Sequence, residues 1–166
     1  MALSRSGVYQ LSDRQVCQKL SFNGLPEDAQ IERITVFDRK LMLAVRGLGL
    51  FQCSAECNHV FEFSPDLSNT RVRELAPHNN TLYVGTHKHG FYALNNHGSV
   101  QLHWHRNAAT APYDFTLPVN GVMTLLPTEN NIWAGLWAGG LQQFDIKSGK
   151  KVSSSQYYAP DTTTVG

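Results

Sequence analysis

The chain alternates short apolar runs with polar turns rich in glycine, asparagine and aspartate. The clearest example is NIWAGLWAGGLQQFD, residues 131–145, in which the runs IWA and LQQF flank a glycine-rich stretch. Glycine reaches positive φ without a Cβ clash, so this stretch allows a tight reversal of the chain. The pattern predicts two antiparallel strands joined by a turn.

This arrangement recurs along the chain. When the last glycine of each turn is aligned, Gly140 matches Gly90, Gly49 and Gly7, at intervals of 50, 41 and 42 residues in the numbering. An apolar residue follows each of these register glycines: Val8, Leu50, Phe91 and Leu141. The next position is aromatic at Tyr9, Phe51 and Tyr92, with Gln142 as the exception. A period of about 40–50 residues with several short strands is typical of β-propeller blades.

The spacing predicts an all-β fold of four-stranded antiparallel blades. We expect a half blade at 2–20 and full blades near 31–63, 71–105 and 120–157, about three and a half blades in all. A closed propeller has roughly 4–8 blades, so we expect this chain to be part of a larger propeller. A second copy of the chain is the other way to complete a ring, with about seven blades. No segment shows the sustained apolar spacing of a helical bundle.

Composition narrows the function classes. The net charge is +1 and only 16% of the residues are charged, so we expect no nucleic-acid partner. No run of about 18 apolar residues occurs, and we expect no direct membrane insertion by this segment. The first residues, MALSRSGVYQLS, lack the continuous apolar region of a signal peptide.

The strongest copy of the repeat, NIWAGLWAGGLQQFD, resembles the blades of the two-component regulator propellers, whose pattern is close to IWxGTxxGGLxxFD. TLYVGTHKHGFYALN keeps the Gly85-Thr86 pair, whereas Val45 and Leu136 depart from the threonine position. The resemblance implies a periplasmic sensor portion of a bacterial signalling protein whose output is a histidine kinase or a diguanylate cyclase. TLYVGTHKHGFYALN with Trp104 also resembles the quinoprotein-like repeat, which implies a scaffold for protein–protein interaction.

Ligand-binding candidates lie three residues before the register glycine, in the turn between the second and third strands of a blade. This position holds Ser4, Arg46, His87 and Trp137, which differ in chemistry. Arg46 can clamp a carboxylate or sulfate, His87 and the nearby His89 can form hydrogen bonds, and Trp137 can stack on a sugar ring. The alternative is that these turn residues vary because nothing constrains them.

The long link between the second and third full blades is a further candidate. It runs from 106 to 119 and carries Tyr113, Asp114 and Phe115 between prolines. Long loops on a rigid scaffold often carry binding residues, and we expect this one at the same end as the turn candidates. A packed surface insertion is the alternative.

Metal and thiol chemistry receive less support. The pairs His87/His89 and His103/His105 each alternate as on one strand face, but spacing identifies no third ligand, so we expect no metal site and no cofactor. Cys53 and Cys57 flank a predicted turn, and both a local disulfide and two free thiols stay open.

The leading hypothesis is a non-catalytic extracytoplasmic binding module. Its ligand would be glycan-derived or another small molecule, and its other partner would be the rest of the propeller or a second copy of the chain. The alternatives are the quinoprotein-like scaffold and, less favoured, a propeller lyase or hydrolase. No catalytic motif is present, and His87 with Tyr113 is the only pair that could serve such an enzyme.

Overall fold

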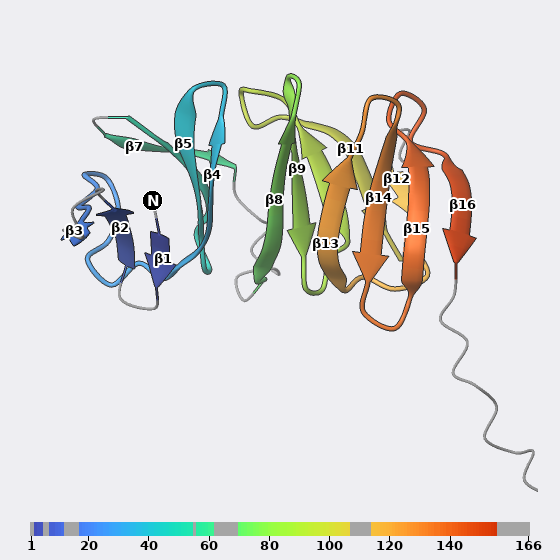
Figure 1. The fold of residues 1–166 in the computed structure, drawn as a ribbon, viewed down its shortest axis with the longest axis horizontal. Helices are drawn as coiled ribbons and strands as arrows, with labels where there is room; N and C mark the ends of the chain where they lie inside the picture. The colour runs from blue at the N-terminus through green and yellow to red at the C-terminus, as the bar shows by residue number, and fades with distance from the viewer. Residues whose placement is uncertain are drawn as a thin grey trace, which may run out of the picture.

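The computed structural model describes residues 2–4, 7–11, 17–54, 56–61, 70–106 and 114–155. These residues form four β-sheets that stand side by side, with β1–β3 at one end of the stack and β13–β16 at the other (Figure 1). The predicted all-β fold of antiparallel blades is confirmed. None of the described segments forms a helix with the length and apolarity needed to cross a bilayer.

The first two sheets are antiparallel and follow the chain order. The first contains β1 (Ala2–Ser4), β2 (Gly7–Leu11) and β3 (Cys17–Lys19). The second contains β4 (Ile31–Phe37), β5 (Lys40–Val45), β6 (Gly49–Cys53) and β7 (Cys57–Phe61). The first sheet therefore has three described strands, one more than the half blade expected from the sequence.

The third and fourth sheets repeat the plan of the second. The third contains β8 (Val72–His78), β9 (Thr81–Thr86), β10 (Phe91–Leu94), β11 (Val100–His105) and β12 (Asp114–Thr116). The fourth contains β13 (Val122–Pro127), β14 (Asn131–Leu136), β15 (Gly140–Asp145) and β16 (Lys151–Ser155). The first strands of successive full blades lie side by side, since β8 contacts both β4 and β13.

The register glycines are required by the backbone. Gly49, Gly90 and Gly140 all have positive φ, between 68° and 93°. A Cβ on Gly90 would also overlap the carbonyl group of Trp104 on β11. A side chain at this position is therefore excluded by both the backbone conformation and the neighbouring strand.

Apolar side chains fill the space between successive sheets. One cluster joins Val8 to the β4–β7 sheet, a second joins Met42 and Leu50 to the β8–β12 sheet, and a third joins Tyr83 and Phe91 to the β13–β16 sheet. The second and third sheets thus each have one face toward the preceding sheet and one toward the following sheet. Strand alternation assigns neighbouring residues to opposite faces.

The third sheet has a fifth strand that was not predicted. β12 pairs in parallel with β11, and Trp104 is opposite Phe115. The two rings are 5.7 Å apart, and the indole Nε1 of Trp104 donates a hydrogen bond to the carbonyl oxygen of Gly149, at 2.8 Å. Residues 114–116 of the link thus form an edge strand of the third sheet, with Phe115 packed against Trp104.

Cys53 and Cys57 form a disulfide across the end of the β6–β7 hairpin. The same hairpin anchors the loop that leads into β4, because the N–H of Cys57 donates to the carbonyl oxygen of Asn23, at 2.8 Å. Of the two alternatives that the sequence left open, the structure has the disulfide.

Candidate functional site

The three candidate turns each join the second and third strands of a blade, so they lie at the same end of the strands in all three full blades. We call this side of the molecule the turn end. In each full blade the N–H of the turn residue donates to the carbonyl oxygen of the residue that precedes the first strand. The pairs are Arg46 to Gln30, His87 to Arg71 and Trp137 to Gly121, at 2.9, 2.9 and 2.7 Å. Each turn is therefore fixed beside the segment that enters its own blade.

Glu32 forms a buried ion cluster at the turn end. Its side chain is 6% exposed, and its Oε1 accepts hydrogen bonds from the Nε atoms of Arg46 and Arg71, at 2.9 and 3.2 Å. Its Oε2 accepts from the N–H of Val72, at 2.7 Å. One carboxylate thus joins the turn of the β4–β7 blade to the start of the β8–β12 blade.

A β-bulge places Glu32 in this cluster. The pairing of β4 with β5 shifts register between Ile31 and Arg33, and the same shift occurs at the start of β8 and of β13. A bulge re-aims the side chain of the extra residue. Glu32 therefore reaches the next blade, whereas the equivalent positions carry Arg73 and Met123.

The two guanidinium groups remain open to solvent. The side chains of Arg46 and Arg71 are 40% and 50% exposed, and each contributes only Nε to Glu32. Within the described residues, their terminal nitrogens have no hydrogen-bond partner. Two positive charges against one negative charge leave a local excess of one positive charge. Such an arrangement suits a carboxylate or sulfate, which arginine binds through paired N–H groups.

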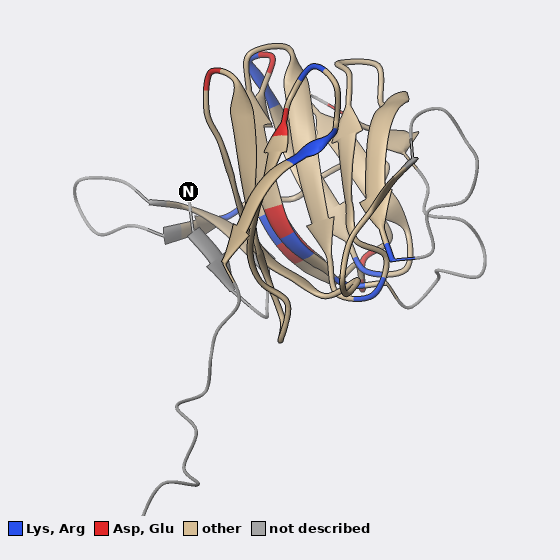
Figure 2. Ribbon diagram, turned by 90° about the vertical axis from the view of Figure 1, so that its right-hand side faces the viewer, with Lys and Arg blue, Asp and Glu red and all other residues tan. Residues whose placement is uncertain are grey.

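Charged side chains also connect the first strands of the blades. Arg33 donates from Nε to the carbonyl oxygen of Arg73, at 2.6 Å, and Thr124 donates from its hydroxyl to a carboxylate oxygen of Glu74, at 3.3 Å. Figure 2 shows acidic and basic residues side by side on neighbouring strands of the stack. Charged side chains from β4 and from the segment that enters β8 therefore lie where the second and third sheets meet.

His87 and Trp137 continue the turn end beyond the ion cluster. His87 is half-buried and its backbone is bonded to Arg71, whereas Trp137 is 64% exposed. A Cβ added to Gly121 would lie 3.1 Å from the Cβ of Trp137 and 3.4 Å from the carbonyl oxygen of His87. Both turns therefore border the same glycine. Arg46, Arg71, His87 and Trp137 form a continuous series across three blades.

His89 belongs to a different group. Its carbonyl oxygen lies 2.9 Å from Nε2 of His103, whose ring stacks on those of Tyr92 and His105 at 4.0 and 4.1 Å. Burial lowers the pKa of His89, and the charges of Lys88 and His105 lower it further. Among the residues that the structure describes, no group of three or more His, Cys, Asp or Glu side chains could hold a metal ion.

The other link candidates are placed only in part. Tyr113 lies outside the described residues, and Asp114 and Phe115 belong to β12. The end of the link returns to the turn end, where the side-chain oxygen of Asn120 accepts from the N–H of Arg106 at 2.6 Å. The carbonyl oxygen of Asn120 accepts from the N–H of Gly90, at 2.9 Å.

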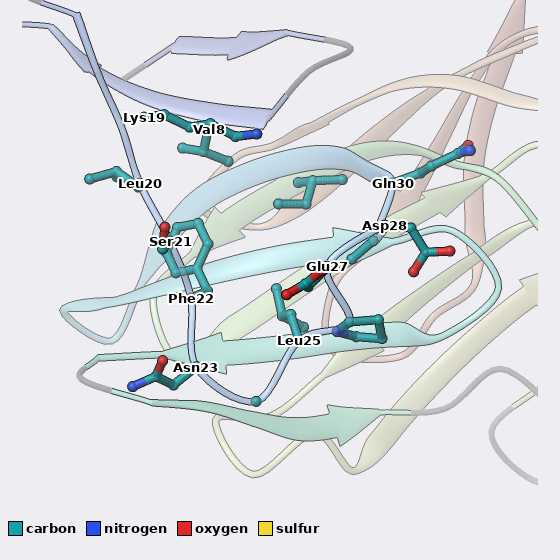
Figure 3. Close-up of a pocket in the computed structure, with 14 residues that line it drawn as sticks. Val8, Lys19, Leu20, Ser21, Phe22, Asn23, Leu25, Glu27, Asp28 and Gln30 are labelled. Carbon is teal, nitrogen blue, oxygen red and sulfur yellow. The ribbon is translucent and has the colours of Figure 1, made fainter.

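A cavity of about 730 Å³ lies under the loop between β3 and β4 (Figure 3). Apolar and polar side chains both line it, among them Val8, Lys19, Phe22, Leu25, Glu27, Asp28 and Gln30. Gln30 accepts the N–H of Arg46, so the cavity ends beside the ion cluster. The sequence predicted this segment only as a loop.

Sequence reasoning identified Arg46 but missed Glu32 and Arg71. The available signal was an acid and several bases within strands that otherwise carry apolar residues, in IERITVF and RVREL. That signal identifies unusual strands, but it does not pair residues that lie 39 positions apart in the chain.

No family model and no curated protein matches the sequence. The structure resembles the extracellular domain of the hybrid two-component system BT4673 from B. thetaiotaomicron, with a TM-score of 0.67 and 17% identity, over 95% of this chain and 20% of that one. It also resembles the corresponding domain of BT3049 from the same organism, with a TM-score of 0.63 and 13% identity, over 91% and 20%.

A third likeness is to the computationally designed protein Ika4, with a TM-score of 0.58 and 12% identity, over 81% of this chain and 76% of that one. This chain spans about a fifth of the length of the two extracellular domains. At such low identity the likenesses show the fold. The chain is a set of propeller blades that resemble those of two-component sensor domains.

Proposed function

We propose that this chain is a non-catalytic ligand-binding part of an extracytoplasmic sensor propeller in a bacterial signalling protein. Its ligand carries a carboxylate or sulfate group, as an acidic glycan fragment does, and binds at the turn end. The likeness to extracellular sensor domains and the disulfide both support a location outside the cytoplasm, in the periplasm.

The pairing of Arg46 and Arg71 on the buried carboxylate of Glu32 carries this proposal. Glu32 holds both guanidinium groups in place, so they lose little conformational freedom when an anion binds. Their terminal N–H groups then face a ligand in a fixed arrangement, with one excess positive charge to attract it. The cavity beside them is lined by two acids, Glu27 and Asp28, and one base, Lys19, so it is less suited to an anion.

His87 and Trp137 supply neutral contacts next to the charged pair. The exposed indole of Trp137 can stack on the apolar face of a sugar ring. His87, which is bonded through its backbone to Arg71, can form a hydrogen bond with a hydroxyl group. A ligand that spans these residues would contact three blades at once.

Binding would act by a population shift. Arg46 belongs to one blade and Arg71 to the link into the next, so a bound anion would favour the arrangement in which those blades are close. A kinase or cyclase output attached to the propeller would respond to that preference.

Calorimetric titration with sulfated, carboxylated and neutral disaccharides tests this function. We expect binding of the anionic sugars to weaken with salt, and Arg71→Gln to reduce affinity roughly 10- to 100-fold, because charged hydrogen bonds are lost. Arg39→Gln is the matched control, since Arg39 lies in the β4–β5 turn at the opposite end of the blade. Equal affinity for the neutral disaccharide, or an equal loss in the control, would refute the proposal.

The scaffold alternative is favoured by one observation, the exposed apolar face of the β13–β16 sheet. That face could bind another protein. Its residues, however, occupy the positions through which blades of this chain pack on one another, which favours a blade as the occupant.

A further inference from the structure

One face of the β13–β16 sheet has no neighbouring sheet within the described part of the chain. Leu126, Trp133 and Leu141 lie on this face. Leu126 on β13 is paired with Trp133 on β14, and Leu141 on β15 is paired with Gly135, which shares a face with Trp133 because the two are two residues apart on one strand. Leu126 is 62% exposed and Leu141 is 40% exposed. The opposite face, with Ile132, Ala134 and Phe144, is buried against the preceding blade.

In the two preceding blades the counterparts of these residues are buried, apart from Thr35 on β4, which corresponds to Leu126 and is half-buried. Leu141 directly follows a register glycine, as Leu50 and Phe91 do, and both of those side chains are fully buried. Leu126 corresponds to Ala76, which is 9% exposed. Trp133 corresponds to Met42 and Tyr83, both buried. In each earlier blade these residues pack against the sheet that follows in the chain. The exposed face is therefore a blade-packing surface, which we call the forward face.

The surface that fits a forward face also recurs in the chain. The residue two positions after the register glycine is aromatic in β6 and β10, where Phe51 and Tyr92 are buried against the blade before them. The equivalent residue in β2 is Tyr9. Because Val8 packs toward β4–β7, Tyr9 lies on the opposite face of its sheet. The chain therefore carries both halves of one more blade-to-blade contact.

The two halves cannot meet within one described chain, because the β1–β3 and β13–β16 sheets lie at opposite ends of the stack (Figure 1). We propose that the forward face formed by Leu126, Trp133 and Leu141 binds the Tyr9 face of the β1–β3 sheet in a second copy of this chain. Two such head-to-tail contacts close a ring of two copies. The four sheets of each copy make eight, within the range of closed propellers.

Light scattering on a sizing column, over a range of protein concentrations, tests this interface. We expect a particle of twice the 18.5 kDa mass of one chain. Leu141→Asp should weaken the association roughly 30-fold or more, as expected for a central residue of an interface. Val36→Asp is the matched control, because Val36 is 55% exposed but lies on β4, away from the forward face, and this variant should remain a dimer.

A mixing experiment distinguishes a head-to-tail contact from a symmetric one. At a concentration just sufficient for the wild type to dimerise, Tyr9→Ser and Leu141→Asp should each be monomeric alone, yet form a dimer when mixed, because one intact contact remains between the two variants. Circular dichroism of each variant verifies its fold. A wild-type chain that stays monomeric, or a Leu141→Asp or Tyr9→Ser variant that dimerises as tightly as the wild type, would overturn the proposal. None of these outcomes depends on the ligand proposed above.

Discussion

At the residue scale, Glu32 has the greatest structural and functional weight. Its buried carboxylate accepts hydrogen bonds from three donors, and two of those donors belong to the neighbouring blade or to the link that enters it. Breaking a buried charged contact is unfavourable because the remaining partners stay desolvated. When Glu32 is replaced, water can hydrate the half-exposed guanidinium groups of Arg46 and Arg71, which limits the loss of stability.

We expect Glu32→Ala to lower the free energy of unfolding by about 1–3 kcal/mol, since the N–H of Val72 loses its acceptor and the two guanidinium groups repel each other. Glu32→Gln should lose less, because an amide oxygen can still accept from Val72. Urea unfolding measures both changes. Glu129→Gln, in an exposed turn, should stay within about 0.5 kcal/mol of the wild type. An unchanged Glu32→Ala midpoint would contradict the role assigned to this carboxylate.

His89 gives the protein a pH-dependent term in its stability. Burial, with smaller contributions from Lys88 and His105, lowers the pKa of His89 below its ordinary value of 6.5. The unfolded chain therefore binds more protons at this residue than the folded chain does as the pH falls through 6.5. The stability contributed by neutral His89 is present above that pH and is lost progressively below it.

We accordingly expect the midpoint of urea unfolding to fall as the pH is lowered from 7.5 toward 5.5, about one unit on either side of the ordinary histidine value. His89→Gln should reduce the size of this fall. An NMR titration of the His89 ring gives its pKa directly. A value at or above 6.5 would contradict the burial argument.

At the scale of elements, the disulfide hairpin and the loop before β4 act together. Cys57 is bonded to Cys53 through sulfur and to Asn23 through its backbone N–H. Gly24, with a φ of 87°, lies so close to the carbonyl of Cys57 that a Cβ would press against it. The hairpin therefore shapes the loop that covers the cavity next to Arg46.

Replacing both cysteines, Cys53→Ser with Cys57→Ser, should lower the free energy of unfolding by about 2 kcal/mol, the loop-entropy value for so short a ring. In this double variant, exchange of the backbone amide hydrogens should accelerate at position 57 and through the loop at 21–30, because the anchoring hairpin opens more often. Reductant should reproduce this change in the wild type and have no further effect on the double variant. Unchanged exchange in the loop would contradict the role of the hairpin in holding this loop over the cavity.

Strand positions were largely predictable at this scale, and the exceptions have physical causes. Hairpins such as 131–145 follow from apolar runs on either side of a glycine turn, which are local signals. β12 was missed because three residues in a long link carry little pattern of their own. Pairing with β11 and packing of Phe115 against Trp104 make them a strand.

At the scale of the whole molecule, the blades form an open stack with chemically distinct ends. The β1–β3 sheet presents the Tyr9 face, and the β13–β16 sheet presents the forward face. The apolar residues on the forward face are the same kind that are buried between the inner blades. Exposed apolar surface of this kind marks an interaction site, which is why the mass of the particle in solution is the decisive property at this scale.

The candidate site was predictable in position more than in composition. The repeat placed Arg46, His87 and Trp137 in equivalent turns, and the structure brings those turns to one end. His89, two residues from His87, instead contacts His103, because the turn directs the two histidines to different neighbours. Placement of Tyr113 stays a prediction, since it lies outside the described residues.

The repeat of glycine, apolar and aromatic positions was enough to infer blades, because strands and turns depend on neighbours that are close along the chain. The cluster of Glu32, Arg46 and Arg71 depends on two features that no local pattern encodes: a bulge that turns Glu32 toward the next blade, and the packing of one blade on the next. The exposure of Leu141 is likewise invisible in a repeat where its counterparts are buried. Local periodicity specifies the units, whereas charge pairing and exposed faces arise where those units meet.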